Sequence, residues 1–315
     1  MTAQAPPAPP DTPTATPRPA PAGRRPESAW LRRAPLLPAL VFTIVVTQVP
    51  FLFSIYYSLT EWRVVPPTPR TFVGFENYVR GWGDPFFLRA AWTSVWMTVA
   101  AVLLSLVIGT ALALLLDRKF PGRGVARTLM ITPFLVMPVV AGLVWSNQMF
   151  SSQFGVLNWV ITSLGFDAVS FVQVAPGWSI VTVLVWQWSP FMMLIVLAGL
   201  QGQPGEVLEA ARVDGAGPFG IFRWITLPLL RPYLELGILL GSIYLVQVFD
   251  HIVVITGGGP GSTNIPYFVY QRSIGGGWDF GLASSFSILV VIASIIIATL
   301  ALRLLSNLIS KDPNA

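Results

Sequence analysis

The chain has 315 residues, of which 54% are hydrophobic and only 10% are charged, and its formal net charge is +5. Soluble domains usually carry about 25% charged residues, so this composition excludes an ordinary soluble domain and indicates a membrane protein with several spans. The chain has no cysteine, which excludes disulfides and thiolate chemistry, and its single histidine, His251, argues against a histidine metal cluster. The positive charge is better explained by cytoplasmic loops and a basic tail than by nucleic acid.

The N-terminal segment is rich in proline, alanine and threonine. A segment of this composition cannot bury enough apolar surface to offset its ordering entropy, so we expect residues 1–33 to be a disordered tail. It does not resemble a signal peptide, because the first long apolar run begins only near Leu36. We expect one transmembrane domain over residues 34–311.

Six apolar runs follow the tail, and each is close to the roughly 20 residues that a helix needs to cross the hydrocarbon core. Their approximate ranges are 36–58, 92–116, 125–149, 177–200, 233–255 and 284–308. Prolines such as Pro133, Pro138 and Pro190 lie in or near these runs, where neighbouring helices can satisfy the freed carbonyls. The pattern predicts an all-α integral membrane protein with kinked helices.

Lysine and arginine indicate the orientation of these spans, because positive residues favour cytoplasmic loops. Fourteen of them fall in the tail, the second loop, the fourth loop and the C-terminal end, against five in the other loops. Both termini and the fourth loop, at about residues 201–231, are therefore predicted to face the cytoplasm.

The fourth loop carries the sequence Glu209-Ala210-Ala211-Arg212-Val213-Asp214-Gly215, followed by Ile225-Thr226-Leu227-Pro228. Its charges alternate in sign over a helical stretch, and its two small alanines permit the close approach of a partner surface. Glycine can take the left-handed conformation that ends a helix, and Pro218 suits the first turn of the next one. The residues alone predict a short helix, a sharp turn and a second helix, which is also what an ordinary solvated loop could form.

The spacing Glu-Ala-Ala-x3-Gly-x9-Ile-x-Leu-Pro resembles, at every fixed position, the EAA motif of permease subunits of bacterial ABC importers. This resemblance implies a six-helix, MetI-like permease fold in which the loop is a coupling helix docked on an ATPase. The residues that it assigns to this contact are Glu209, Ala210, Ala211, Arg212, Asp214 and Gly215. It also implies the partners: a second permease subunit, two ATP-binding subunits, an extracytoplasmic solute-binding protein and membrane lipid, with no nucleic acid.

ATP and magnesium are expected on the partner ATPase, and no cofactor is expected in this chain. The sequence has no G-x-x-x-x-G-K-[ST] phosphate loop, and we expect the chain not to be an enzyme. The glycine-rich stretch Thr256–Thr263 lacks the lysine of such a loop, and we interpret it as a flexible outer turn.

Two further stretches resemble carbohydrate-importer permeases. Residues 72–78 are similar to an F-x-G-[FL]-x-N-[FY] element, and residues 249–264 are similar to an FD-x-I-x-x-x-T-x-G-G-P-x-x-x-T element. Residues 265–272 look like polyol (sorbitol or mannitol) permeases in particular. Permeases for trehalose, other disaccharides and glycerol phosphate share much of this pattern, so those substrates stay open as alternatives.

The expected spans contain amides and aromatic residues but almost no charge. Amides hydrogen-bond hydroxyl groups in both directions, and aromatic rings cover the C–H faces of a sugar or polyol. The residues predicted to line the substrate path are Asn147, Gln187, Trp188, Tyr244, Gln247 and Asp250. The alternatives are contacts between helices for the amides, packing for the tryptophans and an interhelical pair for Asp250, which lies well inside the fifth expected span. His251 is more readily explained as a structural residue.

The function predicted from these observations is the permease subunit of an ATP-driven importer for a sugar or polyol. The first alternative is the same machine carrying trehalose, another disaccharide or glycerol phosphate. An ion-coupled secondary transporter is a second alternative, but it usually shows internal repeats or intramembrane ion-coupling residues. A membrane-embedded enzyme would need a catalytic constellation, which the sequence does not offer.

Overall fold

The computed structural model describes residues 36–309, so the tail predicted over residues 1–33 lies outside the described residues. The chain divides into two compact units, residues 1–51 and residues 52–315. The described helices and strands, in chain order, are α2 (Leu37–Ser58), β1 (Thr60–Glu61), β2 (Thr71–Phe72), α3 (Glu76–Trp82), α4 (Pro85–Asp117), α5 (Arg123–Leu135), α6 (Pro138–Val144), the π-helical turn η2 (Trp145–Met149), α7 (Val156–Ser163), α8 (Phe171–Val174), α9 (Pro176–Gln201), α10 (Gly205–Val213), α11 (Pro218–Ile221), the π-helical turn η3 (Phe222–Thr226), α12 (Leu227–Leu245), α13 (Asp250–Ile255), α14 (Ile265–Arg272) and α15 (Phe280–Ile309). The first unit contributes the N-terminal part of α2, whose side chains are mostly apolar.

The structure is helical, as the sequence predicts, and strands β1 and β2 form only a short antiparallel pair. Three of the described helices, α2, α4 and α9, are long and apolar enough to cross a membrane. The α5–α6 pair, extended by η2, would make a fourth span if it is counted as one. Helix α15 covers the whole range expected for the sixth span.

The range 125–149, expected as one span, is instead a broken helix. Helices α5 and α6 are bent by 98° at a break that contains Val136 and Met137. Pro138 opens α6 and has no N–H to continue the hydrogen-bond ladder of α5 across the break. Pro190, by contrast, lies inside α9, which runs without interruption from Pro176 to Gln201.

The sequence also predicts one span over residues 233–255, and this prediction is wrong because the helix is interrupted. Helical backbone begins at Pro218, continues through α11, η3 and α12, and ends at Leu245. Residues 246–249 form a second break, and Asp250 opens the separate short helix α13. Asp250 therefore lies at a helix start beside a break, not in the middle of a span.

The core of the second unit is the crossing of α4 and α9. Met192, Met193 and Val196 of α9 are fully buried. A Cβ at Gly109 of α4 would lie 2.6 Å from the Cβ of Met192 and 2.8 Å from the carbonyl oxygen of Ser189. Only glycine allows the two backbones to approach this closely, as is typical of helix pairs in membranes.

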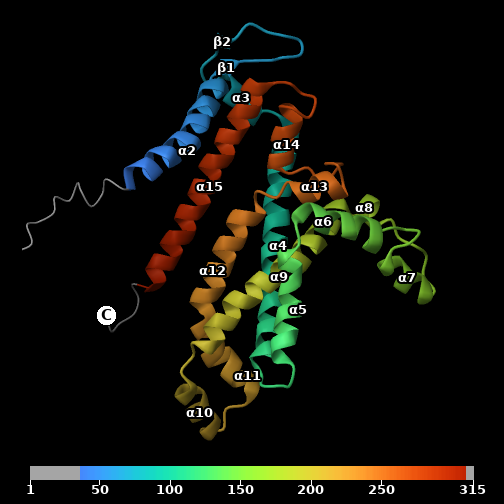
Figure 1. Ribbon diagram of the computed structural model, residues 1–315, viewed down its shortest axis with the longest axis vertical. Helices are drawn as coiled ribbons and strands as arrows, with labels where there is room; N and C mark the ends of the chain where they lie inside the picture. Colours follow the sequence, from blue (N-terminus) through green and yellow to red (C-terminus); the bar gives the residue numbers. More distant parts are fainter. Residues whose placement is uncertain (1–35, 310–315) are drawn as a thin grey trace, which may run out of the picture. The chain divides into compact units, whose positions relative to one another are not determined.

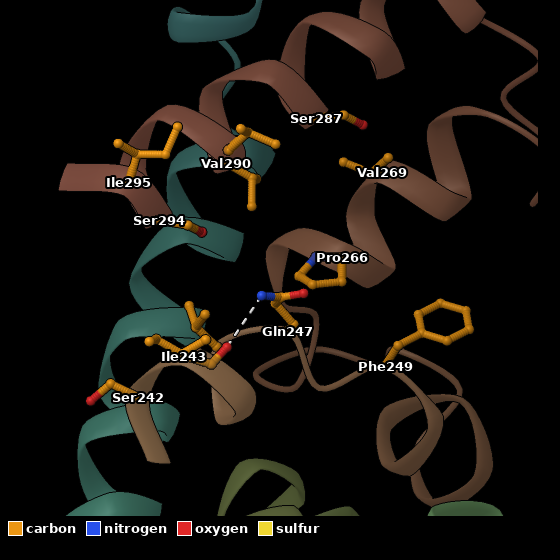
Figure 2. A pocket seen from close by; sticks show the side chains of 12 residues that line it. Ser242, Ile243, Gln247, Phe249, Pro266, Val269, Ser287, Val290, Ser294 and Ile295 are labelled. Atoms are coloured by element: carbon orange, nitrogen blue, oxygen red, sulfur yellow. Dashed lines mark hydrogen bonds between the residues drawn. The ribbon is translucent and has the colours of Figure 1, made fainter. Parts of the chain in front are cut away.

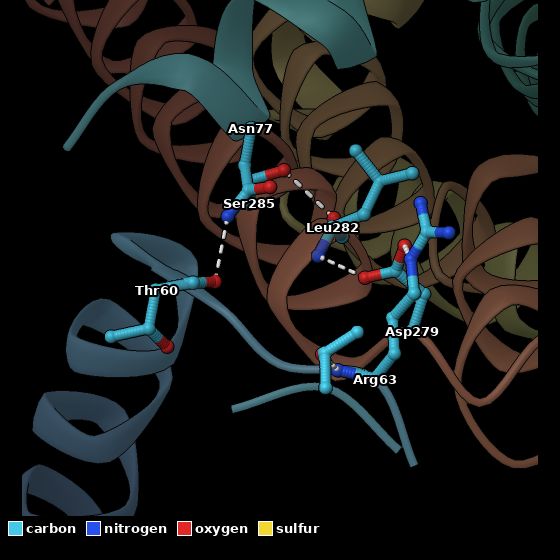
Figure 3. Close-up of polar contacts among 7 residues, drawn as sticks. Thr60, Arg63, Asn77, Asp279, Leu282 and Ser285 are labelled. Atoms are coloured by element: carbon cyan, nitrogen blue, oxygen red, sulfur yellow. Dashed lines mark hydrogen bonds and ion pairs between the residues drawn. The ribbon is translucent and has the colours of Figure 1, made fainter. Parts of the chain in front are cut away.

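Thr60, Asn77 and Asp279 belong to a polar network at the end of the second unit opposite α10 and α11 (Figures 1 and 3). Asn77 is 1% exposed and donates from its amide nitrogen to the carbonyls of Ser58 and Thr60, at 3.0 and 2.9 Å. Asp279 pairs with Arg63 at 2.9 Å and accepts from the backbone N–H of Leu282 at 3.0 Å. The asparagine of the F-x-G-[FL]-x-N-[FY] stretch thus holds the end of α2 and the start of β1 in place.

The stretch Thr256–Thr263 is a compact turn, which corrects the expectation of a flexible one. Thr263 Oγ1 donates to the carbonyl of Gly258 at 2.6 Å, and Ser262 Oγ donates to the carbonyl of Gly259 at 2.8 Å. Ser262 is completely buried. Gly258 has φ +70°, and a Cβ there would collide with the ring of Tyr267, so the turn requires glycine at this position.

Candidate functional site

The first candidate site is the exposed loop formed by α10 and α11, which Figure 1 places at one end of the second unit. Helix α10 ends in two hydrogen bonds: the N–H of Ala216 donates to the carbonyl of Ala211 at 2.9 Å, and that of Gly215 donates to Arg212 at 3.1 Å. Gly215 has φ +82°. This is the Schellman arrangement, and it explains why the sequence has glycine after Asp214.

The surface of this loop presents both charges and large apolar side chains. Val213 is 88% exposed, Phe219 is 78% exposed and Trp224 is 74% exposed. The charged side chains of α10 and its C-cap are exposed as well, and none forms an ion pair with another described residue. Exposed apolar side chains gathered in one place mark an interaction surface.

The loop is tied to the transmembrane helices at its base. Gln203 Nε2 donates to the carbonyl of Thr226 at 3.2 Å, which joins the connection between α9 and α10 to the end of η3. The π-helical turn η3 passes directly into α12. The segment that enters α10 is thus bonded to the helical backbone that leads into α12. Sequence reasoning did not single out Gln203, because a lone glutamine in a polar loop carries no signal of its partner.

The second candidate site is a cavity of about 500 Å³ between α5, α6, α9, α12 and α13. Ligand pockets in proteins commonly have volumes of about 300–1,000 Å³. Five of the six residues predicted for the substrate path line it: Gln187, Trp188, Tyr244, Gln247 and Asp250. The sixth, Asn147, does not; it lies in η2 and donates to the carbonyl of Leu143 in its own helical segment at 3.0 Å.

Aromatic rings form one wall of this cavity. The ring of Trp188 lies 5.6 Å from that of Tyr244, 5.4 Å from Phe191 and 5.7 Å from Phe134, measured between centroids. Such a wall offers π-faces to the C–H groups of a ligand. Sequence reasoning missed Phe134 and Phe191, which look like ordinary apolar residues until the fold brings them to Trp188.

The polar atoms of the cavity differ in whether they are free to bind a ligand. Gln187 is 4% exposed, and both ends of its amide already have partners: the nitrogen donates to Val136 at 2.6 Å, and the oxygen lies 2.8 Å from His251 Nε2. Gln247 is exposed and donates only to Ile243 in the preceding helical turn, at 3.2 Å. Asp250 is exposed, and its carboxylate has no ion-pair partner among the described residues. Gln247 and Asp250 are thus available to a ligand, as is the hydroxyl of Tyr244, which is 60% exposed.

A second cavity, of about 640 Å³, adjoins the first one and shares Gln247 and Phe249 with it. Figure 2 shows its lining by side chains from α12, α14 and α15. Ser287 and Ser294 of α15 line it seven residues apart, on one face of that helix. Their seven-residue spacing is a signal for this shared face that can be read in the sequence.

In the part of the chain that the structure describes, no group of three or more His, Asp or Glu residues could hold a metal ion.

Comparison with known proteins gives consistent results. Residues 71–311 match the family described as "Binding-protein-dependent transport system inner membrane component". A probable ABC transporter permease protein of Sinorhizobium fredii is 36% identical, over 85% of this chain and 88% of the relative. A trehalose/maltose transport system permease protein of Thermococcus litoralis is 35% identical, over 85% and 90%. A sulfoquinovosyl glycerol transport system permease protein of Agrobacterium fabrum is 32% identical, over 86% and 88%.

Solved structures agree on the fold. A chain of a bacterial ABC transporter involved in the import of the acidic polysaccharide alginate superposes with a TM-score of 0.75, at 21% identity, over 88% of this chain and 96% of that one. A methionine ABC transporter in an inward-facing conformation matches with a TM-score of 0.52, over 70% and 94%. The chain is an all-α membrane protein with the MetI-like permease fold, and it belongs to the family of inner membrane components of binding-protein-dependent transport systems.

Proposed function

We infer that the chain is one of two permease subunits of an ATP-driven importer, and that its cargo is a neutral sugar or polyol. In this proposal residues 34–311 form the transport domain, which pairs with a second, similar permease. Two ATP-binding subunits dock on the α10–α11 loop, and an extracytoplasmic solute-binding protein delivers the cargo. ATP and magnesium bind to the partner ATPases.

The observation that carries the cargo class is the composition of the 500 Å³ cavity. It combines the rings of Trp188 and Tyr244 with the free polar groups of Gln247 and Asp250. Among the described residues that line it, none is a lysine or arginine. A phosphate ester would call for a cation near its path, because an unpaired charge is costly inside a membrane. The lining therefore favours a neutral polyhydroxyl compound over glycerol phosphate.

The names of the relatives bear on whether the cargo is a disaccharide or a simple polyol. Two of the relatives are named for trehalose or maltose and for sulfoquinovosyl glycerol, and neither of these names is that of a simple polyol. A trehalose transport system permease protein of Mycobacterium tuberculosis is a further relative, at 29% identity. A disaccharide is accordingly as strong a candidate as the sorbitol or mannitol that residues 265–272 suggest.

Coupling to ATP hydrolysis is assigned to Glu209, Ala210, Ala211, Arg212, Asp214 and Gly215. Their support is the exposed helix α10, its unpaired charges and the surrounding apolar side chains. The connection between α4 and α5, which contains Arg118 and Lys119, lies at the same end of the second unit as α10 (Figure 1). Positive residues favour the cytoplasmic side, which supports a cytoplasmic position for this end. The lysines and arginines near the two ends of the sequence support the same side for both termini.

The test is the ATPase rate of the co-expressed complex in lipid, with its binding protein and a panel of polyols, disaccharides and glycerol phosphate. Stimulation by a polyol or a disaccharide supports the proposed cargo class and decides between its two members. Stimulation by glycerol phosphate alone would keep the machine and refute the neutral cargo. A complex without any ATPase activity would contradict the coupling role of α10.

A further inference from the structure

Two broken helices contribute to the lining of the 500 Å³ cavity. One wall includes Val136 and Pro138 at the α5–α6 break, and the other includes Val248 and His251 at the α12–α13 break. A break in a helix leaves backbone carbonyls without their usual partners. Inside a membrane such a carbonyl must find a donor in the protein or in the water of a cavity.

A side-chain amide from a distant part of the chain supplies that donor at each break. Gln187 of α9 donates to the carbonyl of Val136, 51 residues away in sequence. Asn264, at the start of α14, donates to the carbonyl of Val248, 16 residues away. Both amide side chains are almost completely buried, at 4% exposure each. The two breaks are thus built in the same way.

Gln187 also joins the two breaks to each other. Its amide nitrogen is used by Val136, so its oxygen is the atom that faces His251 Nε2, at 2.8 Å. That oxygen can only accept, and His251 therefore donates from Nε2. His251 is 3% exposed and is the second residue of α13. A continuous path of two hydrogen bonds connects the α5–α6 break to the start of α13.

Packing between α6 and α13 reinforces this connection. A Cβ at Gly142 of α6 would lie only 3.1 Å from the Cγ1 atom of Val254 in α13, so the two short helices are in close contact. The two cavity walls are held together at two places, by hydrogen bonds at Gln187 and by close packing at Gly142.

We propose that Gln187 and His251 are positioning residues that couple the two helix breaks, so that the two walls of the cavity change conformation together. This role replaces the sequence prediction that Gln187 binds substrate. Its importance for transport rests on the function proposed above, but the coupling itself is a property of this chain and can be tested without ATP or cargo.

The natural chain has no cysteine, so a single introduced cysteine reports on one position alone. Met137→Cys places a thiol at the α5–α6 break, where the native side chain is 68% exposed. The measurement is the rate at which a small charged methanethiosulfonate reagent labels this thiol in the assembled complex, in lipid. The substitution whose effect is measured is made at His251, which Gln187 connects to the α5–α6 break. Leu164→Cys, just after α7, is the control reporter, because the native side chain is 70% exposed and lines neither cavity.

His251→Phe keeps a ring but removes the donor, and His251→Gln restores an amide donor at a similar reach. We expect His251→Phe to raise the labelling rate of Met137→Cys about fivefold, the factor that corresponds to one lost neutral hydrogen bond. We expect His251→Gln to return the rate to that of the parent, and Leu164→Cys to be labelled equally in all three backgrounds. An unchanged rate in His251→Phe, or an equal rise in His251→Gln, would overturn the coupling.

Gln187→Leu tests the same link from its centre, with Gln247→Cys as the reporter at the second break. The Gln187→Leu variant also provides the test if His251→Phe does not accumulate in the membrane. In uptake assays we expect Gln187→Leu to lower the maximal rate about fivefold and to leave the half-saturation constant unchanged. A raised half-saturation constant would instead make Gln187 a substrate ligand and refute the positioning role. If the labelling rates change as expected but the unmodified complex takes up no cargo, the coupling stands and the transport function is refuted.

Discussion

The backbone N–H of Ala216 donates to the carbonyl of Ala211 at 2.9 Å, and this bond closes the C-terminal end of α10. The chain can make it because Gly215, between the two, adopts φ +82°. Ala211 belongs to the Glu-Ala-Ala element, so the residues assigned to ATPase contact and the turn that orients them form one unit. The glycine of the motif is required by backbone geometry.

Replacement of Gly215 by alanine should weaken coupling. No atom lies within 4 Å of the position that a Cβ would occupy, so the cost is conformational only, about 1 kcal/mol for a left-handed residue with a side chain. We expect Gly215→Ala to fray the end of α10 and to reduce cargo-stimulated ATPase activity of the reconstituted complex. Gly217→Ala is the matched control, because Gly217 has φ −71° and equally open surroundings. Equal activity of the two variants would contradict a role for the turn.

Reversal of the charge at Glu209 should abolish uptake and leave the protein in the membrane. Glu209 is exposed and has no ion pair among the described residues, so the folded chain loses nothing when it is replaced. We expect Glu209→Lys to lose at least about 90% of cargo uptake, since a misplaced charge in an interface costs several kcal/mol. Glu206→Lys makes the same change one turn earlier in α10 and should be much milder. Normal uptake by Glu209→Lys would refute the docking role of this helix.

The α10–α11 loop could be predicted from the sequence because its determinants are local. Gly215 ends one helix and Pro218 begins the next, and both signals lie within a few residues of the elements they shape. The aromatic and amide composition of the spans likewise pointed to Trp188 and Tyr244, which do line one cavity. The prediction for Trp188 and Tyr244 rested on side-chain chemistry alone.

The two helix breaks could not be predicted in the same way. Hydropathy measures only the length of an apolar run, and Val136 and Val248 are as apolar as their neighbours. What makes the breaks tolerable is a donor from elsewhere in the chain, Gln187 for one and Asn264 for the other. Asp250 was therefore placed inside a span, whereas it stands at the start of a short helix.

Removal of the Asn77 side chain should destabilise the protein. Its amide nitrogen serves two carbonyls, those of Ser58 and Thr60, in a site with 1% exposure. We expect Asn77→Ala to lower the free energy of unfolding by about 2 kcal/mol, because buried polar groups lose their partner. Asn147→Ala is the control, since Asn147 is exposed and bonds only to Leu143. The apparent unfolding temperature of the purified protein in detergent distinguishes them, and an equal value for both variants would contradict the structural role of Asn77.

Truncation of Trp188 should weaken cargo recognition. Its ring forms the centre of the aromatic wall, 5.6 Å from the ring of Tyr244, and it lines the cavity. We expect Trp188→Ala to raise the half-saturation constant for uptake about tenfold, the size of a lost aromatic contact, and Trp188→Phe to raise it less. Trp186 is the natural comparison, because it is also partly buried in α9 but packs against Trp145 at 5.7 Å and does not line the cavity. Trp186→Ala can reduce the amount of folded protein, but the half-saturation constant does not depend on that amount and should be unchanged. If both tryptophan variants raise it equally, the cavity wall does not contact the cargo, and the 640 Å³ cavity beyond Gln247 becomes the better candidate.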